Sequence, residues 1–414
     1  MIYTDEKQLY NHISELMMGE GIDFVVYAIV SPWHAIGVDA LVYNISQRKN
    51  EKLSGMVIIN AHPISGFLIN EADFACPSFA TVQFFFLDCR LKTQESGVST
   101  RKEFFKTRLN ILRGIVNIRR EGKRHEKEVR IVSVLVPNIT FLQIFRDRRL
   151  AGKYSPTFSI LDEGMSTYFP IRNWVLIMKS INQTDGRKHF QLAQFLRTKM
   201  QRRLYRPLGI MALRFVTTEY LFLFREERGK LIPNDPVVNS YRYIIEKKGE
   251  VYEKTKNTRP LALVITQPFS ELWQVSLTYE LSLIETVVDI LVQMDFDILL
   301  KPHPSEPPGK YDPILTKFES ERVRLSLNNK VPVEILFPSL DPACIIGYTS
   351  TALVIAKTMY DIPAITIIDI IATVTDEEAI RLNQSEFKRL TAEICSCADT
   401  FEKLKDILSS VKVT

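Results

Sequence analysis

Three short polar segments carry side chains suited to proton transfer and to binding an anion. In the first, Asp162 and Glu163 precede Gly164, directly after an apolar run that ends at Leu161. Neighbouring carboxylates raise one another's pKa, so one of them could serve as a general base near neutral pH. The alternative is a solvated turn, as many such short motifs are.

The second segment places a histidine between two prolines. Lys301, Pro302, His303 and Pro304 follow an apolar run. Prolines on both sides restrict the backbone and so fix the direction of the imidazole. A histidine held beside a lysine in this way could donate a hydrogen bond to a phosphate or protonate a leaving group. The alternative is a structural turn.

The third segment is rich in hydroxyl groups. Thr349, Ser350 and Thr351 lie between an apolar run and an apolar helical pattern, so we expect them at a helix N-terminus. Hydroxyls, backbone N–H groups and the helix dipole bind anions together, although a simple N-cap has the same sequence. GxGxxG and Walker-type spacings are absent, which disfavours a dinucleotide or triphosphate site.

Two further segments follow predicted strands. Gln267 and Pro268 come after one strand, and Trp33 and His34 come after another. A tryptophan at a strand end can stack on a sugar ring, or it can belong to the core. Both segments are candidates for contact with a ligand.

Apolar runs that resemble strands precede these segments, and helical patterns lie between the runs. The predicted strands are 24–30, 55–60, 82–87, 129–136, 157–161, 261–266, 297–300, 343–346 and 363–368. This alternation predicts an α/β fold with two Rossmann-like lobes, each with a parallel sheet and crossover helices. Lobes that face a central cleft would bind a ligand near the carboxyl ends of their strands.

One helical pattern in the second half has a clear apolar face. Leu277, Leu281, Ile284, Val288 and Leu291 recur at spacings of three and four residues. Residues at this spacing share one side of a helix, so we expect all five in the core.

A charged, apolar-poor segment between Glu246 and Pro260 predicts the domain boundary, with domains at 1–250 and 255–414. The first domain contains residues 172–214, which hold ten Lys or Arg residues against one acid. This stretch has the composition of a basic amphipathic helix inserted in the domain. It is either a solvated helix face or a surface for an anionic membrane or acceptor.

Composition limits the possible classes of protein. With 414 residues, 46% of them hydrophobic and 24% charged, the chain is expected to be globular, and a net charge of +5 is too small to indicate nucleic acid as a partner. Five cysteines without a CxxC pair are typical of a reducing compartment. With no apolar signal segment and no apolar run of 18 residues, we expect a cytoplasmic protein whose membrane contact is at most peripheral.

Four motifs occur in one order along the chain: SPWH at 31–34, DEG at 162–164, KPHP at 301–304 and TST at 349–351. This ordered set resembles the bacterial sialyltransferases of the capsule polysialyltransferase and lipooligosaccharide sialyltransferase type. Those families show a D/E-D/E-G motif, an HP motif and a paired serine or serine–threonine motif on a two-lobed GT-B fold. A TQPxSE-like loop at 266–271 fits them as well.

The resemblance implies an inverting sialyltransferase that takes sialic acid from CMP-sialic acid. Asp162 would be the general base, Glu163 would orient or tune it, and His303 would help the nucleotide leave. Gly164, Trp33 and His34 would lie on the acceptor side, in the first domain. The donor-binding residues of the second domain would be Gln267, Pro268, Lys301, His303, Pro304, Thr349, Ser350 and Thr351. The families have two adjacent hydroxyl residues where this chain has three, so the pair is either 349–350 or 350–351.

The chemistry agrees with this assignment, because a single donor phosphate can be stabilised by lysine, histidine, hydroxyls and a helix dipole without Mg²⁺. No DxD-type site is evident, so we expect neither a metal nor another cofactor. The expected partners are a nucleotide-sugar donor, a glycan acceptor, the inner membrane face through 172–214 and a second copy of the chain, but not nucleic acid. Two alternatives remain: another GT-B transferase, for Kdo or a CDP-linked polyol or glycerol phosphate, and a non-catalytic subunit of surface-polysaccharide assembly.

Overall fold

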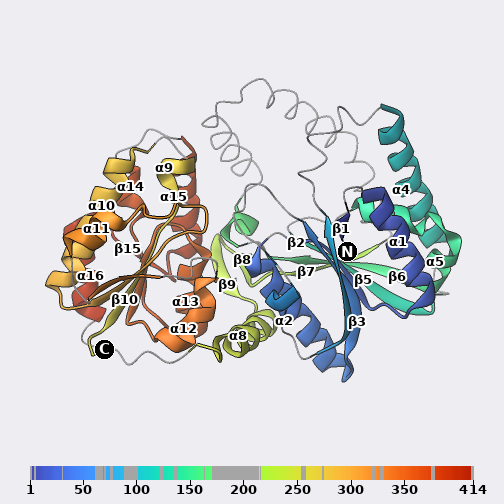
Figure 1. Ribbon diagram of the computed structural model, residues 1–414, viewed down its shortest axis with the longest axis horizontal. Helices are drawn as coiled ribbons and strands as arrows, with labels where there is room; N and C mark the ends of the chain where they lie inside the picture. The colour runs from blue at the N-terminus through green and yellow to red at the C-terminus, as the bar shows by residue number, and fades with distance from the viewer. Residues whose placement is uncertain are drawn as a thin grey trace. The chain divides into compact units, whose positions relative to one another are not determined.

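The computed structural model contains two compact α/β units (Figure 1). The first unit holds the described residues up to Asp162 together with 214 and 216–222, and the second holds 164–169 and those from Leu223 onward. The residues that the structure describes are 2–3, 6–29, 31–60, 69, 71–74, 78–87, 101–121, 125–134, 139–162, 164–169, 214, 216–252, 258–272, 275–318, 322–326, 331–373 and 378–411.

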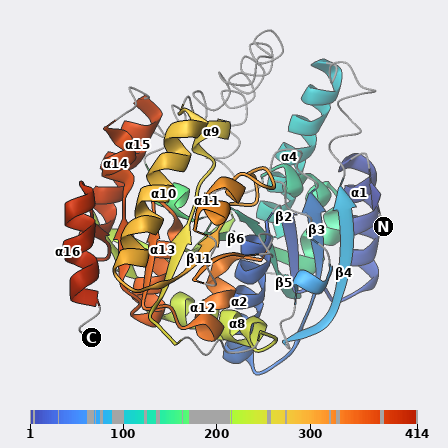
Figure 2. The ribbon, with the colours of Figure 1, turned by 60° about the vertical axis from the view of Figure 1, so that its left-hand side comes forward.

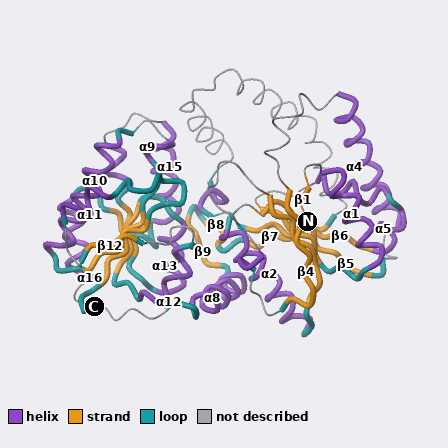
Figure 3. Tube along the Cα trace, in the orientation of Figure 1, coloured by secondary structure: helices purple, strands orange, loops and turns teal. Residues whose placement is uncertain are grey.

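The first unit is built on a seven-stranded parallel sheet, drawn in orange in Figure 3. Its strands are β1 (Ile2–Tyr3), β2 (Phe24–Ile29), β3 (Leu53–Asn60), β4 (Phe79–Leu87), β5 (Lys127–Val134), β6 (Tyr154–Leu161) and β7 (Thr217–Leu221). They lie in the order β1-β4-β3-β2-β5-β6-β7, and their pairings are parallel. Apart from the short edge strand β1, this is the 3-2-1-4-5-6 order of the Rossmann fold.

Helices cover this sheet through apolar faces. The helical segments are α1 (Glu6–Gly19), α2 (Pro32–Lys49), η1 (Glu71–Asp73), α4 (Arg101–Glu121), η2 (Ile139–Arg146) and α5 (Arg148–Lys153). Leu9 and Ile13 of α1 and Ile111 and Ile115 of α4 are buried in one cluster with the strands. Each pair is four residues apart, so it lies on one side of its helix.

The second unit repeats the same topology in a six-stranded parallel sheet. Its strands are β10 (Leu261–Ile265), β11 (Asp297–Lys301), β12 (Val323–Leu325), β13 (Cys344–Gly347), β14 (Ala364–Thr366) and β15 (Ser396–Cys397). Their order, β12-β11-β10-β13-β14-β15, is again 3-2-1-4-5-6. The predicted class, α/β with two Rossmann-like lobes, is therefore confirmed, while the central cleft stays a prediction.

Helices cover both faces of the second sheet (Figure 2). They are α9 (Phe269–Leu272), α10 (Leu277–Gln293), α11 (Asp312–Lys317), α12 (Val333–Leu340), α13 (Thr351–Tyr360), α14 (Ile368–Ala372), α15 (Glu378–Thr391) and α16 (Phe401–Val411). Ile284, Val288 and Leu291 of α10 are buried against the strands, as predicted. Leu277 is 48% exposed, so its assignment to the core was wrong. It is the first residue of the helix, where the apolar face has not yet met the sheet.

The segment before β10 belongs to the second unit. It comprises η3 (Met165–Tyr168), the hairpin of β8 (Phe224–Glu227) and β9 (Lys230–Pro233), and α8 (Asp235–Gly249). A Cβ on Gly249 would lie 2.9 Å from the carbonyl oxygen of Ile335, so α8 and α12 pack closely. The units thus divide earlier in the chain than the boundary expected between Glu246 and Pro260. Among the described residues, no helix combines the length and apolar character needed to cross a bilayer.

Candidate active site

Three loops meet at the carboxyl edge of the second sheet. They follow β10, β11 and β13, which are adjacent strands. The order of the sheet reverses between β10 and β13, and ligands of open α/β sheets bind outside such a switch point. The Gln267 side-chain oxygen accepts hydrogen bonds from the Thr349 backbone N–H (3.0 Å) and hydroxyl (3.2 Å), so it joins the two loops that flank this point.

The hydroxyl-rich segment opens helix α13, as expected. Ser350 is the N-cap, and its hydroxyl oxygen accepts the N–H of Ala352 at 3.2 Å. The Thr351 hydroxyl oxygen accepts the N–H of Met165 at 2.8 Å, and the Thr349 hydroxyl donates to Gln267. Since a capping hydroxyl still has its proton, Ser350 is suited to donate to an anion at this helix end.

The DEG motif runs from the first sheet into the second unit. Asp162 follows β6 and is 1% exposed, while Glu163 lies outside the described residues. Gly164 has a φ of 117°, and a Cβ there would lie 2.7 Å from the Thr351 hydroxyl oxygen. The glycine of the DEG motif therefore packs against the TST motif inside the second unit.

His303 is held by its own turn. Its Nδ1 lies 3.1 Å from the Ser305 backbone N–H, and its backbone N–H donates to Glu306 Oε2 at 2.6 Å. Because Nδ1 accepts, the neutral ring carries its proton on Nε2. Burial lowers the pKa of His303; the charges of Glu306 and Glu271 oppose this effect, and that of Lys301 adds to it. Neutral His303 thus presents an Nε2–H donor.

Lys301 ends β11 and is buried. Burial lowers its pKa to about 8, although the charge of Glu334 acts in the opposite direction. Burial likewise raises the pKa of Glu334 to about 7. The Lys301 carbonyl oxygen accepts the N–H of Thr266 at 3.2 Å, which links the first residues after β10 to β11.

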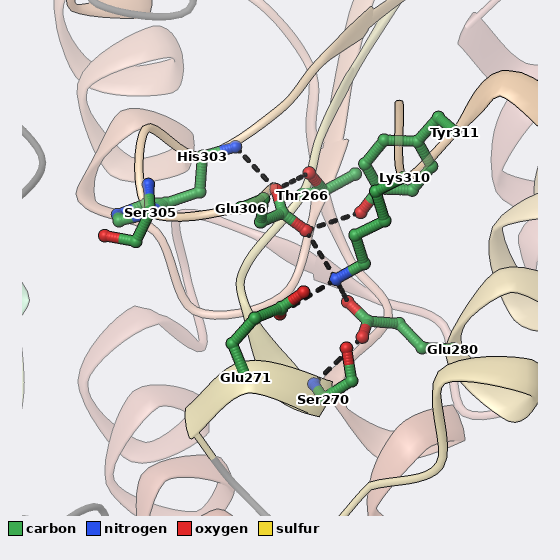
Figure 4. A network of polar contacts seen from close by, with 9 residues as sticks. All are labelled: Thr266, Ser270, Glu271, Glu280, His303, Ser305, Glu306, Lys310 and Tyr311. Atoms are coloured by element: carbon green, nitrogen blue, oxygen red, sulfur yellow. Dashed lines mark hydrogen bonds and ion pairs between the residues drawn. The ribbon is translucent and has the colours of Figure 1, made fainter. Parts of the chain in front are cut away.

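A buried ionic network supports these loops (Figure 4). Lys310 Nζ lies 3.0 Å from Glu271 and 2.9 Å from both Glu280 and Glu306. Glu306 Oε1 also accepts the hydroxyl of Tyr311 at 2.6 Å. Within the described part of the chain, these three carboxylates lie close enough together to share one cation. The ammonium of Lys310 is that cation.

The motifs of the sequence do not include Glu280, Glu306, Lys310 or Tyr311. The available signal was the spacing after the HP motif, because Glu306 is three residues beyond His303 and Lys310 is four beyond Glu306. Such a spacing indicates a turn whose residues can bond to one another. It does not tell whether the charged side chains of that turn are buried or exposed to solvent.

The remaining predicted residues lie elsewhere. Trp33 and His34 lie in the first turn of α2 and not in a loop before it, because the helix begins at Pro32. His34 is buried, which lowers its pKa to about 4. Pro268 and Pro304 lie in the loops after β10 and β11. The basic stretch 172–214 is outside the described residues except for Arg214.

The family of the chain follows from its similarity to known proteins. The family model of alpha-2,8-polysialyltransferase (POLYST) matches residues 25–369. No curated protein matches the sequence significantly.

Several solved structures are similar to this chain. One is an alpha/beta-galactoside alpha-2,3-sialyltransferase of Photobacterium phosphoreum, with a TM-score of 0.46, 13% identity and coverage of 91% of this chain and 99% of that one. Another is the 2,6-sialyltransferase of Photobacterium sp. JT-ISH-224 with CMP and lactose, with a TM-score of 0.45, 11% identity and coverage of 91% and 78%. A UDP-N-acetylglucosamine 2-epimerase described as putative, from Listeria monocytogenes, has a TM-score of 0.45, 10% identity and coverage of 95% and 89%.

The match to the family model extends over well more than half of the sequence and confirms the resemblance inferred from the motifs. The chain therefore belongs to the alpha-2,8-polysialyltransferase family and is a glycosyltransferase of the sialyltransferase type.

Proposed function

We propose that the protein is an inverting, metal-independent enzyme that transfers sialic acid from CMP-sialic acid to a glycan acceptor that itself ends in sialic acid. One observation carries this proposal in a chain of this family. Gln267 and Thr349, at the N-terminus of α13, flank the switch point between β10 and β13, and His303 follows the neighbouring strand β11. This arrangement offers donors to a single phosphate.

The donor phosphate would be bound by groups of the second unit. The Nε2–H of His303, the hydroxyl of Ser350 and the first N–H groups of α13 would donate to its oxygens, while Lys301 would supply positive charge. Gln267 would act through Thr349, which it holds. In this assignment Thr349 and Thr351 position the loop, and Ser350 contacts the phosphate.

The acceptor hydroxyl would lose its proton to Asp162, and Glu163 would orient that carboxylate. The acceptor oxygen then forms a bond to the anomeric carbon of sialic acid. The bond from that carbon to the phosphate oxygen breaks on the opposite face, and CMP leaves with the electron pair. Attack from the opposite face inverts the anomeric centre, and the charge that builds on CMP is stabilised by the phosphate-binding groups.

Trp33 and His34 would contribute to the acceptor side. The proposal has further parts. The protein would be cytoplasmic and would contact the inner membrane face through the 172–214 stretch. It would form a homo-oligomer and would not bind nucleic acid.

The test uses purified protein, CMP-sialic acid and an oligosialic acceptor in excess EDTA. We expect release of CMP and a product longer by sialic acid units. Asp162→Asn should lower turnover by about a hundredfold or more, because the general base is lost.

Asp23→Asn is the matched control, since Asp23 lies at the opposite, amino edge of the same sheet, where it pairs with Lys127. Turnover of Asp162→Asn at the wild-type rate would reject Asp162 as the base. A wild-type protein that releases no CMP with any sialylated acceptor would reject the function, and loss of activity in EDTA that added Mg²⁺ restores would reject metal independence.

A further inference from the structure

The carboxylate of Glu306 joins two of the loops at the site. Its Oε2 accepts the hydroxyl of Thr266, after β10, and the backbone N–H of His303, after β11. The backbone N–H of Glu306 donates in return to the His303 carbonyl oxygen at 2.9 Å. Side chain and backbone of one residue thus close the turn that carries the histidine.

This turn also decides which nitrogen of the ring is protonated. With residues 303 and 306 bonded to each other, the N–H of Ser305 points to Nδ1 of His303 at 3.1 Å. A ring whose Nδ1 accepts must carry its proton on Nε2, the nitrogen that the proposed reaction needs as a donor.

A buried carboxylate needs a cation beside it. Glu306 and Lys310 are both buried, and their charged atoms are 2.9 Å apart. Burial by itself would lower the pKa of Lys310, but its hydrogen bonds and attractions to Glu280, Glu306 and Glu271 outweigh that effect and raise the pKa. The ammonium is therefore present at neutral pH and stabilises the negative charge of Glu306.

We propose that Glu306 is a positioning residue that fixes the direction and tautomer of His303, and that Lys310 is the internal cation that compensates the negative charge of Glu306. This inference rests on the proposed function, in which His303 donates to the leaving phosphate. The carboxylate oxygens of Glu271, Glu280 and Glu306 lie within 4.8 Å of one another, close enough to hold a metal ion. The ammonium of Lys310 occupies the position between them that such an ion would take.

The first test replaces Glu306 in the full chain. Each carboxylate oxygen of Glu306 accepts two hydrogen bonds. In Glu306→Gln one oxygen becomes an NH₂ group, which cannot accept, so the two donors on that side lose their acceptor. We expect kcat to fall about tenfold to a hundredfold, because the histidine is no longer aimed. Glu306→Asp keeps the charge and should recover part of this loss. Glu285→Gln is the control, since Glu285 is a half-exposed carboxylate paired with Lys317 outside the network.

The second readout is ¹⁵N NMR of the histidines without substrate, with the His303 signal assigned by its loss in His303→Asn. We expect the Nε2–H tautomer in the wild type and a mixture of tautomers in Glu306→Gln. A folded Glu306→Gln protein with the wild-type tautomer and wild-type kcat would overturn the proposal. Because this readout needs no substrate, it decides the role of Glu306 even if the wild type transfers nothing and the proposed function fails.

The third test removes the cation with Lys310→Met. The carboxylates of Glu306, Glu271 and Glu280 then face one another without the positive charge between them, and their repulsion should displace Glu306 from the backbone N–H of His303. We expect kcat to fall about tenfold to a hundredfold and the His303 ring to show a mixture of tautomers, as in Glu306→Gln. A residue that only supports the fold would leave the tautomer unchanged, and a folded Lys310→Met protein with the wild-type tautomer and kcat would overturn the role of Lys310.

Discussion

Gly164 adopts a backbone conformation that residues with a side chain rarely enter. Its φ is 117° and its ψ is −156°, and a Cβ would meet the Thr351 hydroxyl oxygen at 2.7 Å. The residue is thus restricted twice, by its own backbone and by the helix end on which it lies. This explains physically why the third position of the DEG motif is a glycine.

Gly164→Ala should therefore destabilise the protein. The backbone strain alone costs about 1–3 kcal/mol, and the added carbon displaces the Met165 N–H from Thr351. Thermal unfolding would measure this loss. Gly152→Ala is the matched control, because a Cβ there meets nothing within 4 Å and alanine favours the helix in which it lies. Equal melting temperatures for Gly164→Ala and wild type would contradict the expectation.

His34 should make the stability of the protein sensitive to acid. Burial lowers its pKa from 6.5 to about 4. Between these values the unfolded chain binds a proton that the folded chain does not, so the free energy of unfolding falls as pH drops through this window. His34→Gln removes the effect.

The wild type should lose about 2 kcal/mol more than His34→Gln when the pH falls from about 7 to about 5. Urea unfolding at both pH values gives the comparison, and each protein serves as its own reference at the higher pH. The same loss in both proteins would show that His34 does not titrate in this way.

At the scale of elements, helix α13 combines a structural cap with the proposed phosphate site. Ser350→Ala removes the cap and should cost about 1 kcal/mol of folding free energy. It should also raise the KM for CMP-sialic acid, because a proposed phosphate donor is lost.

Thr400→Ala separates these two effects. The hydroxyl oxygen of Thr400 accepts the N–H of Lys403 at 3.1 Å at the start of α16, in the same unit. Its loss should cost a similar amount of stability and leave the donor KM unchanged. Steady-state kinetics and thermal unfolding of both variants test this, and a donor KM that changes equally in the two would refute a binding role for Ser350.

Element boundaries were harder to predict than the elements themselves. The apolar run at 24–30 predicted β2, because a strand buried on both faces is apolar throughout. Trp33 and His34 were predicted only as a segment after a strand, whereas α2 already begins at Pro32. Two signals indicate this start, because proline is favoured in the first turn of a helix and Ser31 is a suitable N-cap. Periodicity placed Leu277 on the apolar face, but periodicity does not tell where the sheet begins to cover a helix.

At the scale of the whole molecule, the alternation of strands and helices was enough to predict two Rossmann-like lobes. The order of the strands and the division of the chain were not predictable in this way. Residues 164–169 belong with the second unit because Met165 bonds to Thr351, which is 186 residues away in the sequence. The charged network around Lys310 was missed for the same reason, since Glu280 and Lys310 meet only after β10 and β11 pair.

The bond between Met165 and Thr351 limits how this enzyme could be redesigned. A mutant library could vary the start of α13 so that the enzyme accepts other leaving groups. If such a library changed Thr351, it would also disturb the segment at Met165, which lies far upstream in the sequence. Ser350 can be diversified by itself, whereas Thr351 has to be varied together with Gly164 and Met165. Homologues that exchange one of these three residues should carry a compensating exchange at another.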